Sequence, residues 1–463
     1  MVLVLTVVVL QSISFANYAL TTKTTNIIYG SAPYLTFDGG RTRVTNTEAL
    51  LGISLSDGRA FTPTNNSSID NPIELPVAGQ SFNDIGMLVP RDTDSIALSS
   101  LIGTPYNYWG DDDGDGQGID GITATGSLNL SIVDKNNQAV TRNEVLTICK
   151  APYKLTLSNG EGRLTTRYGV PNESRFNAGN ATYYINPKAS PVICYARPDL
   201  TGNGLSAAVW QSGKGFLTQS ATPSSYGLNF PTTGANKLWF DLKIGGVSQA
   251  LSWAPVSHGG ITATMTDSTK NWVRVTLTGP VATRSQQQSD NPSRIARPSL
   301  PQVFELVGRD RSGNAVVKYG FELKQWFVHR GTQVFTIYSR NLSWCNNIGY
   351  RLPKVRDLTN AVCQGWSSRD HCEGAVGATP SSPENRFRRH IGAGFFTEWG
   401  SMHPHTGDNF YDDWLEYYWT NDNPESNSQF HYRVSSYKGS ITDTGNPTPT
   451  SGEINLAGLC TYP

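Results

Sequence analysis

The sequence predicts a mainly β protein of several domains that ends in an α+β domain. Between about residues 20 and 325, segments of alternating apolar and polar residues recur between turn signals, as in the stretch 126–132. Period-two alternation indicates half-buried strands, and strands without helices build a core by packing sheet on sheet. Helical spacing of apolar residues begins only after Gln325, which places the α+β domain at the C-terminal end.

Length and composition favour an exported protein with several domains. A chain of 463 residues is too long for one hydrophobic core. Lys+Arg and Asp+Glu both number 37, so no long-range field favours nucleic acid or an anionic membrane as a partner. The 45 glycines, 20 tyrosines and 11 tryptophans suit short strands, many turns and aromatic contact surfaces.

The N-terminal segment 1–16 has the features of a signal peptide. Residues 2–10 form an almost unbroken apolar run, and the small residues Ser14 and Ala16 suit cleavage before Asn17. A buried strand and a membrane anchor are the alternatives, but the run is shorter than the roughly 20 residues that span a bilayer. No later segment has the length and apolarity to span, so we expect no membrane span in the mature chain.

Two predicted hairpins share a turn pattern, at residues 133–140 and at Asp310–Val316. Asp, Asn and Gly tolerate the left-handed backbone of a tight turn, and the flanking valines return the chain to the sheet. The pattern resembles the D-x-x-G-N-x-V hairpin common in bacterial immunoglobulin-like domains, from which the first copy departs at Asn137. The resemblance implies tandem Ig-like β-sandwich domains, which we place at residues 17–200 and 201–325.

The region 326–463 has a different order of elements. A helix is expected over Thr336–Gly349, and apolar residues at helical spacing from Val355 to Val362 predict a second helix that ends at Gly365. Long loops come next. The expected strands are Tyr417–Thr420, Phe430–Tyr437 and Ile454–Cys460. This order indicates an α+β domain.

Three stretches of this region resemble the lectin-like modules of enterobacterial surface adhesins related to the intimin/invasin group: the run Trp344–Pro353, the strand Tyr418–Thr420 and the terminal Cys460. The resemblance implies a C-type-lectin-like domain and a disulfide between the first-helix cysteine, Cys345, and Cys460. Animal C-type lectins bind sugar through a Glu-Pro-Asn or Gln-Pro-Asp loop and a Trp-Asn-Asp strand. Neither motif occurs in this region, so the calcium-dependent sugar site does not carry over.

The six cysteines fit an oxidising compartment. Two lie in the middle of the chain and four in the last quarter, so pairing within domains gives one central and two C-terminal bridges; free buried thiols are the alternative. With the bridge that the resemblance implies, the remaining C-terminal cysteines pair by exclusion. The predicted disulfides are Cys149–Cys194, Cys345–Cys460 and Cys363–Cys372.

An acidic loop at residues 111–120 predicts a structural calcium ion. Carboxylates at positions 1, 3 and 5 with glycine at position 6 let oxygens converge on a hard cation where the chain turns. Position 12 is Ile122 rather than Glu, so the loop is no EF-hand, and a solvated acidic turn is the alternative. Without a basic neighbour, such carboxylates repel one another unless a cation is present. The predicted ligands are Asp111, Asp113, Asp115 and Asp120.

The stretch 395–419 combines aromatic residues with His, Asp and Glu, as protein-binding and sugar-binding surfaces do. Some of its aromatic residues are expected in the core: Phe395, Phe396, Trp399 and Trp419. Just before it, Arg386, Arg388 and Arg389 form a basic patch that suits an acidic receptor or a sulfated glycan, with an ordinary solvated loop as the alternative. The residues predicted to bind a receptor are Arg388, His403, Tyr411 and Trp414.

These features predict an exported bacterial surface adhesin, secreted or associated with the outer membrane, that binds a host-cell surface protein or glycan through its C-terminal domain. The β-sandwich domains act as a spacer, and no enzyme is expected. A carbohydrate-active enzyme is one alternative, because Glu398, Asp412 and Asp413 have the residue types of a glycosidase carboxylate pair. A structural subunit of a larger surface assembly is the other.

Overall fold

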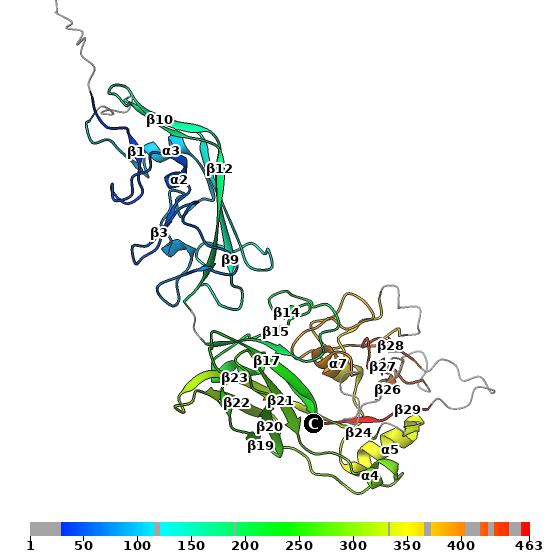
Figure 1. Cartoon of the computed structure of the whole chain (residues 1–463). Coiled ribbons are helices and arrows are strands. Elements are labelled where there is room, and N and C mark those ends of the chain that lie inside the picture. Colours follow the sequence, from blue (N-terminus) through cyan, green and yellow to red (C-terminus); the bar gives the residue numbers. More distant parts are fainter. Residues whose placement is uncertain are drawn as a thin grey trace, which may run out of the picture. The chain divides into compact units, whose positions relative to one another are not determined.

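The computed structural model describes residues 29–114, 121–188, 191–331, 334–364, 372–402, 417–424, 430–443 and 455–463. It divides into two compact units, Met1–Lys188 and Ala189–Pro463, which we call unit 1 and unit 2 (Figure 1). Within the described ranges, no helix has the length and apolarity that crossing a membrane requires.

Unit 1 consists mainly of strands. Its strands are β1 (Tyr34–Leu35), β2 (Ile53–Ser54), β3 (Ala60–Phe61), β4 (Ile73–Glu74), β5 (Ser95–Ala97), β6 (Trp109–Gly110), β7 (Ile122–Thr125), β8 (Ser127–Val133), β9 (Tyr153–Asn159), β10 (Gly162–Thr166), β11 (Glu173–Phe176) and β12 (Gly179–Asn186). Its helical turns are α2 (Thr47–Leu50), η1 (Phe82–Asp84) and α3 (Leu98–Ile102). The largest sheet has the order β4-β12-β9-β8-β5, and a smaller one has the order β11-β10-β7. The long strands β9 and β12 lie side by side and antiparallel (Figure 1).

Alternating burial explains why these segments form strands. In β8, Leu128, Leu130 and Ile132 are buried, whereas Asn129 and Ser131 between them are exposed. Strands β9 and β12 alternate in the same way. The strand prediction for 126–132 is therefore confirmed.

The turn after β8 forms as the sequence predicts. The Asp134 carboxylate accepts hydrogen bonds from the backbone N–H groups of Asn136 and Gln138, at 2.7 and 3.0 Å. Asn137 adopts a left-handed conformation with φ 59°, which asparagine tolerates better than most residues. This asparagine takes the place of the glycine in the hairpin pattern.

Unit 2 begins with strands and ends with mixed helices and strands. Its strands are β13 (Val192–Arg197), β14 (Trp210–Gln211), β15 (Gly215–Leu217), β16 (Thr233–Ala235), β17 (Trp239–Gly245), β18 (Ser252–Trp253), β19 (Val256–His258), β20 (Ile261–Thr266), β21 (Trp272–Thr278), β22 (Gln302–Arg309), β23 (Ala315–Leu323), β24 (Gln325–His329), β25 (Phe335–Thr336), β26 (Tyr417–Trp419), β27 (Arg433–Ser435), β28 (Ile441–Thr442), β29 (Leu456–Ala457) and β30 (Leu459–Tyr462). Its helices are η2 (Pro223–Leu228), α4 (Arg284–Gln288), α5 (Tyr338–Ile348), α6 (Val355–Leu358) and α7 (Phe395–Trp399).

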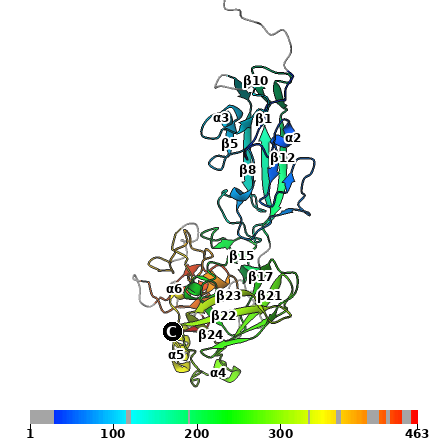
Figure 2. The same cartoon turned by 90° about the vertical axis from the view of Figure 1, so that its left-hand side faces the viewer.

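The first part of unit 2 is a sandwich of two sheets. A seven-stranded sheet has the order β14-β15-β13-β17-β21-β20-β19, and a three-stranded sheet has the order β18-β22-β23. Aromatic side chains meet between them: the Phe240 ring of β17 lies 6.1 Å from the Phe321 ring of β23, centroid to centroid. The hairpin between β22 and β23 (Figure 2) turns at Gly313, with φ 83°, as its sequence pattern predicts.

One core runs through the whole of unit 2. It includes Ile193 of β13, Phe304 of β22, Trp344 of α5 and Cys460 of β30. Strand β24 pairs with β16 of the sandwich on one side and with β30 on the other. The two domains expected on either side of residue 325 therefore form a single compact unit, which already includes β13 before residue 200.

The C-terminal part of unit 2 is α+β. Helix α5 ends at Gly349 in a left-handed conformation with φ 88°, as predicted, because glycine has no Cβ to oppose it. A five-stranded sheet has the order β25-β29-β26-β27-β28, and β26, β27 and β30 lie within the strands expected there or extend them. The predicted fold class, mainly β with an α+β C-terminal part, is confirmed.

Helix α6 is shorter than the sequence predicts, because it ends at Leu358 rather than near Gly365. Asn360 forms hydrogen bonds to residues far away in the sequence instead of the hydrogen bonds of a continued helix. Its N–H donates to Thr397 Oγ1 at 3.0 Å, and its side-chain amide donates to the carbonyls of Pro380 and Arg388, at 3.0 and 2.9 Å. Periodicity from Val355 to Val362 could not reveal these competing hydrogen bonds.

Candidate functional site

Two disulfides lie in the α+β part of unit 2. Cys345 of α5 is bonded to Cys460 of β30, and Cys363 is bonded to Cys372, as predicted. Cys149 and Cys194 are disulfide-bonded as well. Because they belong to different compact units, their pairing with each other stays a prediction.

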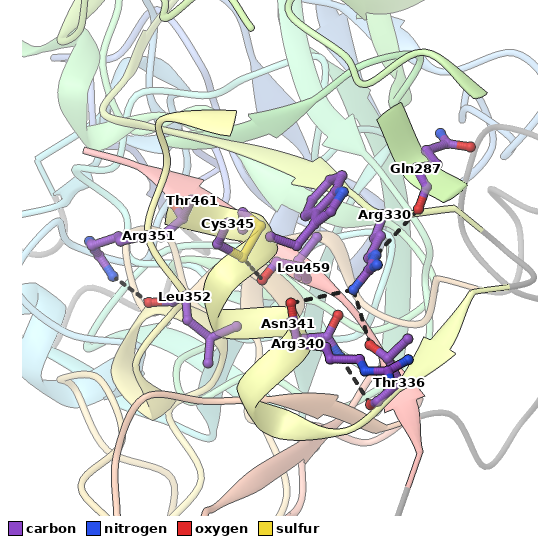
Figure 3. The surroundings of a disulfide bond; sticks show 12 residues. Gln287, Arg330, Thr336, Arg340, Asn341, Cys345, Arg351, Leu352, Leu459 and Thr461 are labelled. Atoms are coloured by element: carbon purple, nitrogen blue, oxygen red, sulfur yellow. Dashed lines mark hydrogen bonds between the residues drawn. A yellow bond between two sulfur atoms is a disulfide. The ribbon is translucent and has the colours of Figure 1, made fainter. Parts of the chain in front are cut away.

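A buried arginine near the first disulfide holds the segments around α5 together (Figure 3). The Arg330 guanidinium donates to the Gln287 carbonyl at 3.3 Å and to Thr336 Oγ1 at 3.1 Å, and it forms an ion pair with Asp290 at 3.1 Å. It also lies 5.5 Å from the centre of the Trp344 ring. Nothing in the sequence pattern singled out Arg330, because Gln287 and Asp290 lie about forty residues before it in the chain.

Arg388 lines a cavity of about 300 Å³ in unit 2, which we call the cationic pocket. Three segments form it: the loop after β13, the stretch before α7 and the turn between β27 and β28. Its lining residues are Thr201, Gly202, Asn203, Glu384, Arg386, Phe387, Arg388, Tyr437 and Lys438. Of the residues predicted to bind a receptor, the described part of the chain contains Arg388 alone, and His403, Tyr411 and Trp414 lie outside it.

Backbone hydrogen bonds join the three segments of the cationic pocket. The Arg389 N–H donates to the Asn203 carbonyl at 2.8 Å, and the Phe387 N–H donates to the Lys438 carbonyl at 2.9 Å. The Asn360 side chain accepts from the Arg388 N–H at 3.0 Å. The pocket walls are thus held by the main chain rather than by the side chains that face the cavity.

The Phe387 ring is enclosed by two glycines from the other two segments. Gly202 and Gly439 have φ values of +85° and +63°, and a Cβ on either one would come within 2.7 Å of the ring. Only glycine allows both this backbone conformation and this close approach. Phe387 is therefore a fixed, nearly buried support for the pocket, with 6% of its surface exposed.

The charged groups of the cationic pocket are unevenly paired. Arg388 Nη2 donates to Glu384 Oε1 at 2.6 Å. Arg386 and Lys438 are exposed, and within the described part of the chain neither forms an ion pair. Lys438 Nζ lies 5.3 Å from the centre of the Tyr437 ring. Three cations and one carboxylate line the pocket, and Asp199, which accepts from the Thr201 N–H and hydroxyl, adds a second carboxylate next to it, so an excess of positive charge remains.

Arg389 does not belong to the surface patch that the sequence suggested. Its side chain is buried, and its guanidinium lies 4.2 Å from the centre of the Trp210 ring. It donates to the carbonyls of Glu398 and Thr201, at 2.6 and 3.3 Å. Burial lowers the pKa of Arg389. This arginine supports the pocket from behind.

Glu398 is fully buried, which argues against a role as an accessible glycosidase acid. Its carboxylate accepts hydrogen bonds from the N–H and hydroxyl groups of Thr232 and Thr233, at 2.6 to 3.1 Å, and from the Gly392 N–H at 2.8 Å. Burial raises the pKa of Glu398, although these hydrogen bonds act to lower it. Glu398 joins α7 to β16, while Asp412 and Asp413 lie outside the described residues.

The aromatic residues expected in the core, Phe395, Phe396, Trp399 and Trp419, are buried as predicted.

The described part of the acidic loop in unit 1 has a basic neighbour. Arg43 forms an ion pair with Asp112, whose carboxylate also accepts from the Tyr34 hydroxyl at 3.2 Å. The Ser31 N–H donates to Asp113 at 2.5 Å. Reasoning from local sequence missed Arg43, which lies far from the loop along the chain.

The calcium ion stays a prediction for this loop. Asp111 and Asp113 lie within the described residues, whereas Asp115 and Asp120 lie outside them. Among the described side chains, no three of His, Cys, Asp and Glu are arranged to hold a metal ion.

No protein-family model matches the chain, and no curated protein matches it either. Among solved structures it resembles invasin, described as a bacterial integrin-binding protein, with 13% sequence identity and a TM-score of 0.35 over 75% of this chain and 52% of the invasin chain. It also resembles a C-terminal 282-residue fragment of intimin in complex with the intimin-binding domain of the translocated intimin receptor, with 12% identity and a TM-score of 0.32 over 75% and 95% of the two chains. The chain thus spans about half the length of the invasin chain that it matches.

Proposed function

We propose that the chain is an exported bacterial surface adhesin, related to the intimin/invasin group, that binds a host-cell surface protein or glycan through its C-terminal α+β part. The sequence resemblance of Trp344–Pro353 and the strand at Tyr418–Thr420 motivates the proposal. Residues 17–325 act as the spacer apart from the loop 201–203, which lines the cationic pocket. A calcium ion orders the acidic loop, and cleavage before Asn17 releases the exported chain.

The cationic pocket is the observation that carries this proposal. It is a concave site on a frame of main-chain hydrogen bonds, and ligand sites are typically preformed cavities with a few convergent polar groups. Arg386 and Lys438 bring cations to it, and arginine is well suited to binding carboxylates and sulfates. A binding role fits this geometry better than catalysis, because the buried Glu398 is already engaged by five donor groups.

Binding of the whole fluorescently labelled chain to host epithelial cells tests the proposal. Saturable binding that excess unlabelled chain displaces is the expected result. Pretreating the cells with protease or with glycosidase identifies the receptor as protein or glycan. Absence of saturable binding would favour a structural subunit, and turnover of a glycan panel would favour an enzyme; either result overturns the proposal.

A further inference from the structure

The cationic pocket has two cations without a carboxylate partner in the described part of the chain. Glu384 is paired with Arg388, whereas Arg386 and Lys438 form no ion pair there although both line the same cavity. They come from segments about fifty residues apart, and the hydrogen bond between Phe387 and Lys438 brings these segments together. Like charges held near one another repel, and a bound anion relieves that repulsion.

We propose that the cationic pocket binds an anionic sugar unit of a host glycan, with a carboxylate or a sulfate as the recognised group. This inference rests on the proposed function, because it names the ligand class of the same site. Arg386 and Lys438 contact the anionic group, and Arg388 is held in place by Glu384 beside it. The guanidinium of Arg386 offers paired donors that match two oxygens of a carboxylate or a sulfate.

The remaining lining residues suit the ring of a sugar. Tyr437 supplies aromatic surface, and the nearly buried Phe387 supports the pocket wall. The exposed Asn203 supplies an amide for sugar hydroxyl groups, and the Thr201 hydroxyl, which donates to Asp199 at 2.5 Å, can accept a further hydrogen bond. A volume of about 300 Å³ is at the lower end of the range for small-ligand pockets. The pocket therefore has room for one sugar unit.

An acidic peptide fits this site less well. A peptide can bind by pairing its main chain with an open strand edge, or its acidic side chains can bind to a cluster of arginines. The main-chain groups that join the pocket segments are already engaged, since Arg389 pairs with Asn203 and Phe387 pairs with Lys438. Strand-edge pairing of a peptide is therefore closed at these segments. A sugar is favoured over acidic peptide side chains because the exposed Asn203 amide can bind hydroxyl groups beside the anionic group, and the oligoglutamate arm of the titration tests this choice.

Isothermal titration calorimetry with the whole chain tests this inference. The ligands are sialyllactose for a carboxylate, a heparin-derived disaccharide for a sulfate, neutral lactose, and an oligoglutamate peptide. We expect one or both anionic sugars to bind, lactose to bind at least about tenfold more weakly, and the affinity to fall as salt rises. Which anionic sugar binds identifies the recognised group.

Charge reversals locate the site. Arg386→Glu and Lys438→Glu should each weaken binding of the anionic sugar by about tenfold or more. Arg311→Glu is the matched control, because Arg311 is exposed in the turn between β22 and β23 and does not line the pocket. Unchanged thermal melting shows that each variant is folded, and the alanine variant at the same position, Arg386→Ala or Lys438→Ala, replaces a reversal that is not.

Each outcome decides for or against the pocket. Binding of neither sugar, equal binding of lactose, or an equal loss in Arg311→Glu overturns the inference. Preferential binding of oligoglutamate overturns it in favour of an acidic peptide. If wild-type chain binds host cells and both pocket variants bind them equally well, the pocket assignment fails while the adhesin proposal stands; if the wild-type chain does not bind cells, the proposed function fails.

Discussion

Acid should destabilise unit 2 through one buried histidine, His329. This side chain is 4% exposed. Its Nδ1 accepts a hydrogen bond from the Gly331 N–H at 2.8 Å, so the proton is on Nε2, which donates to the Tyr418 hydroxyl at 3.0 Å. Burial lowers the pKa of His329 to about 3, from an ordinary value of 6.5. The folded protein therefore holds the imidazole neutral.

The sign and size of the effect follow from proton linkage. Because the pKa is lower in the folded state, the unfolded state binds the extra proton below pH 6.5. The stability is fully present above that pH and falls as the pH is lowered toward the folded pKa. Each pH unit in this window costs about 1.4 kcal/mol, so a change from about pH 7.5 to about pH 5 should reduce the free energy of unfolding by about 2 kcal/mol.

Urea unfolding, followed by tryptophan fluorescence, measures this change in the stability of unit 2. Of the 11 tryptophans, Trp109 alone precedes residue 189, so the signal reports mainly on unit 2. The variant His329→Gln keeps an acceptor and a donor but does not titrate in this range. His258→Gln is the matched control, since His258 is exposed in β19.

The proteins are compared by the change in their free energy of unfolding between the two pH values. A packing defect of His329→Gln that is the same at both pH values cancels from this change. Wild type and His258→Gln should lose about 2 kcal/mol more than His329→Gln over the same pH interval. If all three proteins lose the same amount, His329 is not the group that senses acid and its buried, neutral assignment is wrong.

Two further expectations follow from the structure and two from the sequence. Glu398→Gln should lower the free energy of unfolding by about 1–3 kcal/mol, since its amide N–H₂ would face backbone donors; urea titration measures this. Replacing Cys345 and Cys460 with alanine should cost about 2–5 kcal/mol in the same assay. Calorimetry should detect calcium binding to the wild-type chain and its loss when the four predicted aspartates of the acidic loop become asparagine; no heat of binding would leave an acidic turn. Peptide mapping of the unreduced exported protein should recover Cys149 linked to Cys194, and any other partner contradicts that pairing.

Strands and the first C-terminal helix were predictable because their signals are local. The alternation in β8 records which side chains face the core, and Gly349 marks the end of α5 by a conformation that glycine adopts readily. Helix α6 shows where such reasoning fails, since Asn360 leaves the helix for partners that only the folded chain provides. Local periodicity contains no information about those partners.

The cationic pocket was predictable only in part. Arg388 and Arg386 stand out as a basic cluster in sequence, but Lys438 and Thr201 join them through tertiary hydrogen bonds. Sequence likewise grouped Arg389 with its neighbours, although the alternation along this stretch turns it inward. A cluster of charged residues in the sequence therefore includes Arg389, which does not line the pocket, and omits Lys438, which does.

The buried side chain of Arg389 connects the cationic pocket to the contact between the sandwich and the α+β part of unit 2. Arg389 donates to the Glu398 carbonyl, and the Glu398 carboxylate in turn accepts from Thr232 and Thr233 at the start of β16. Both charged groups are buried, so breaking this connection would leave an uncompensated polar group inside the protein. The pocket segment is thereby fixed to the sandwich, while Arg386 and Lys438 stay exposed on it. The exposed side chains of the pocket are thus free to change without disturbing the buried groups that position them.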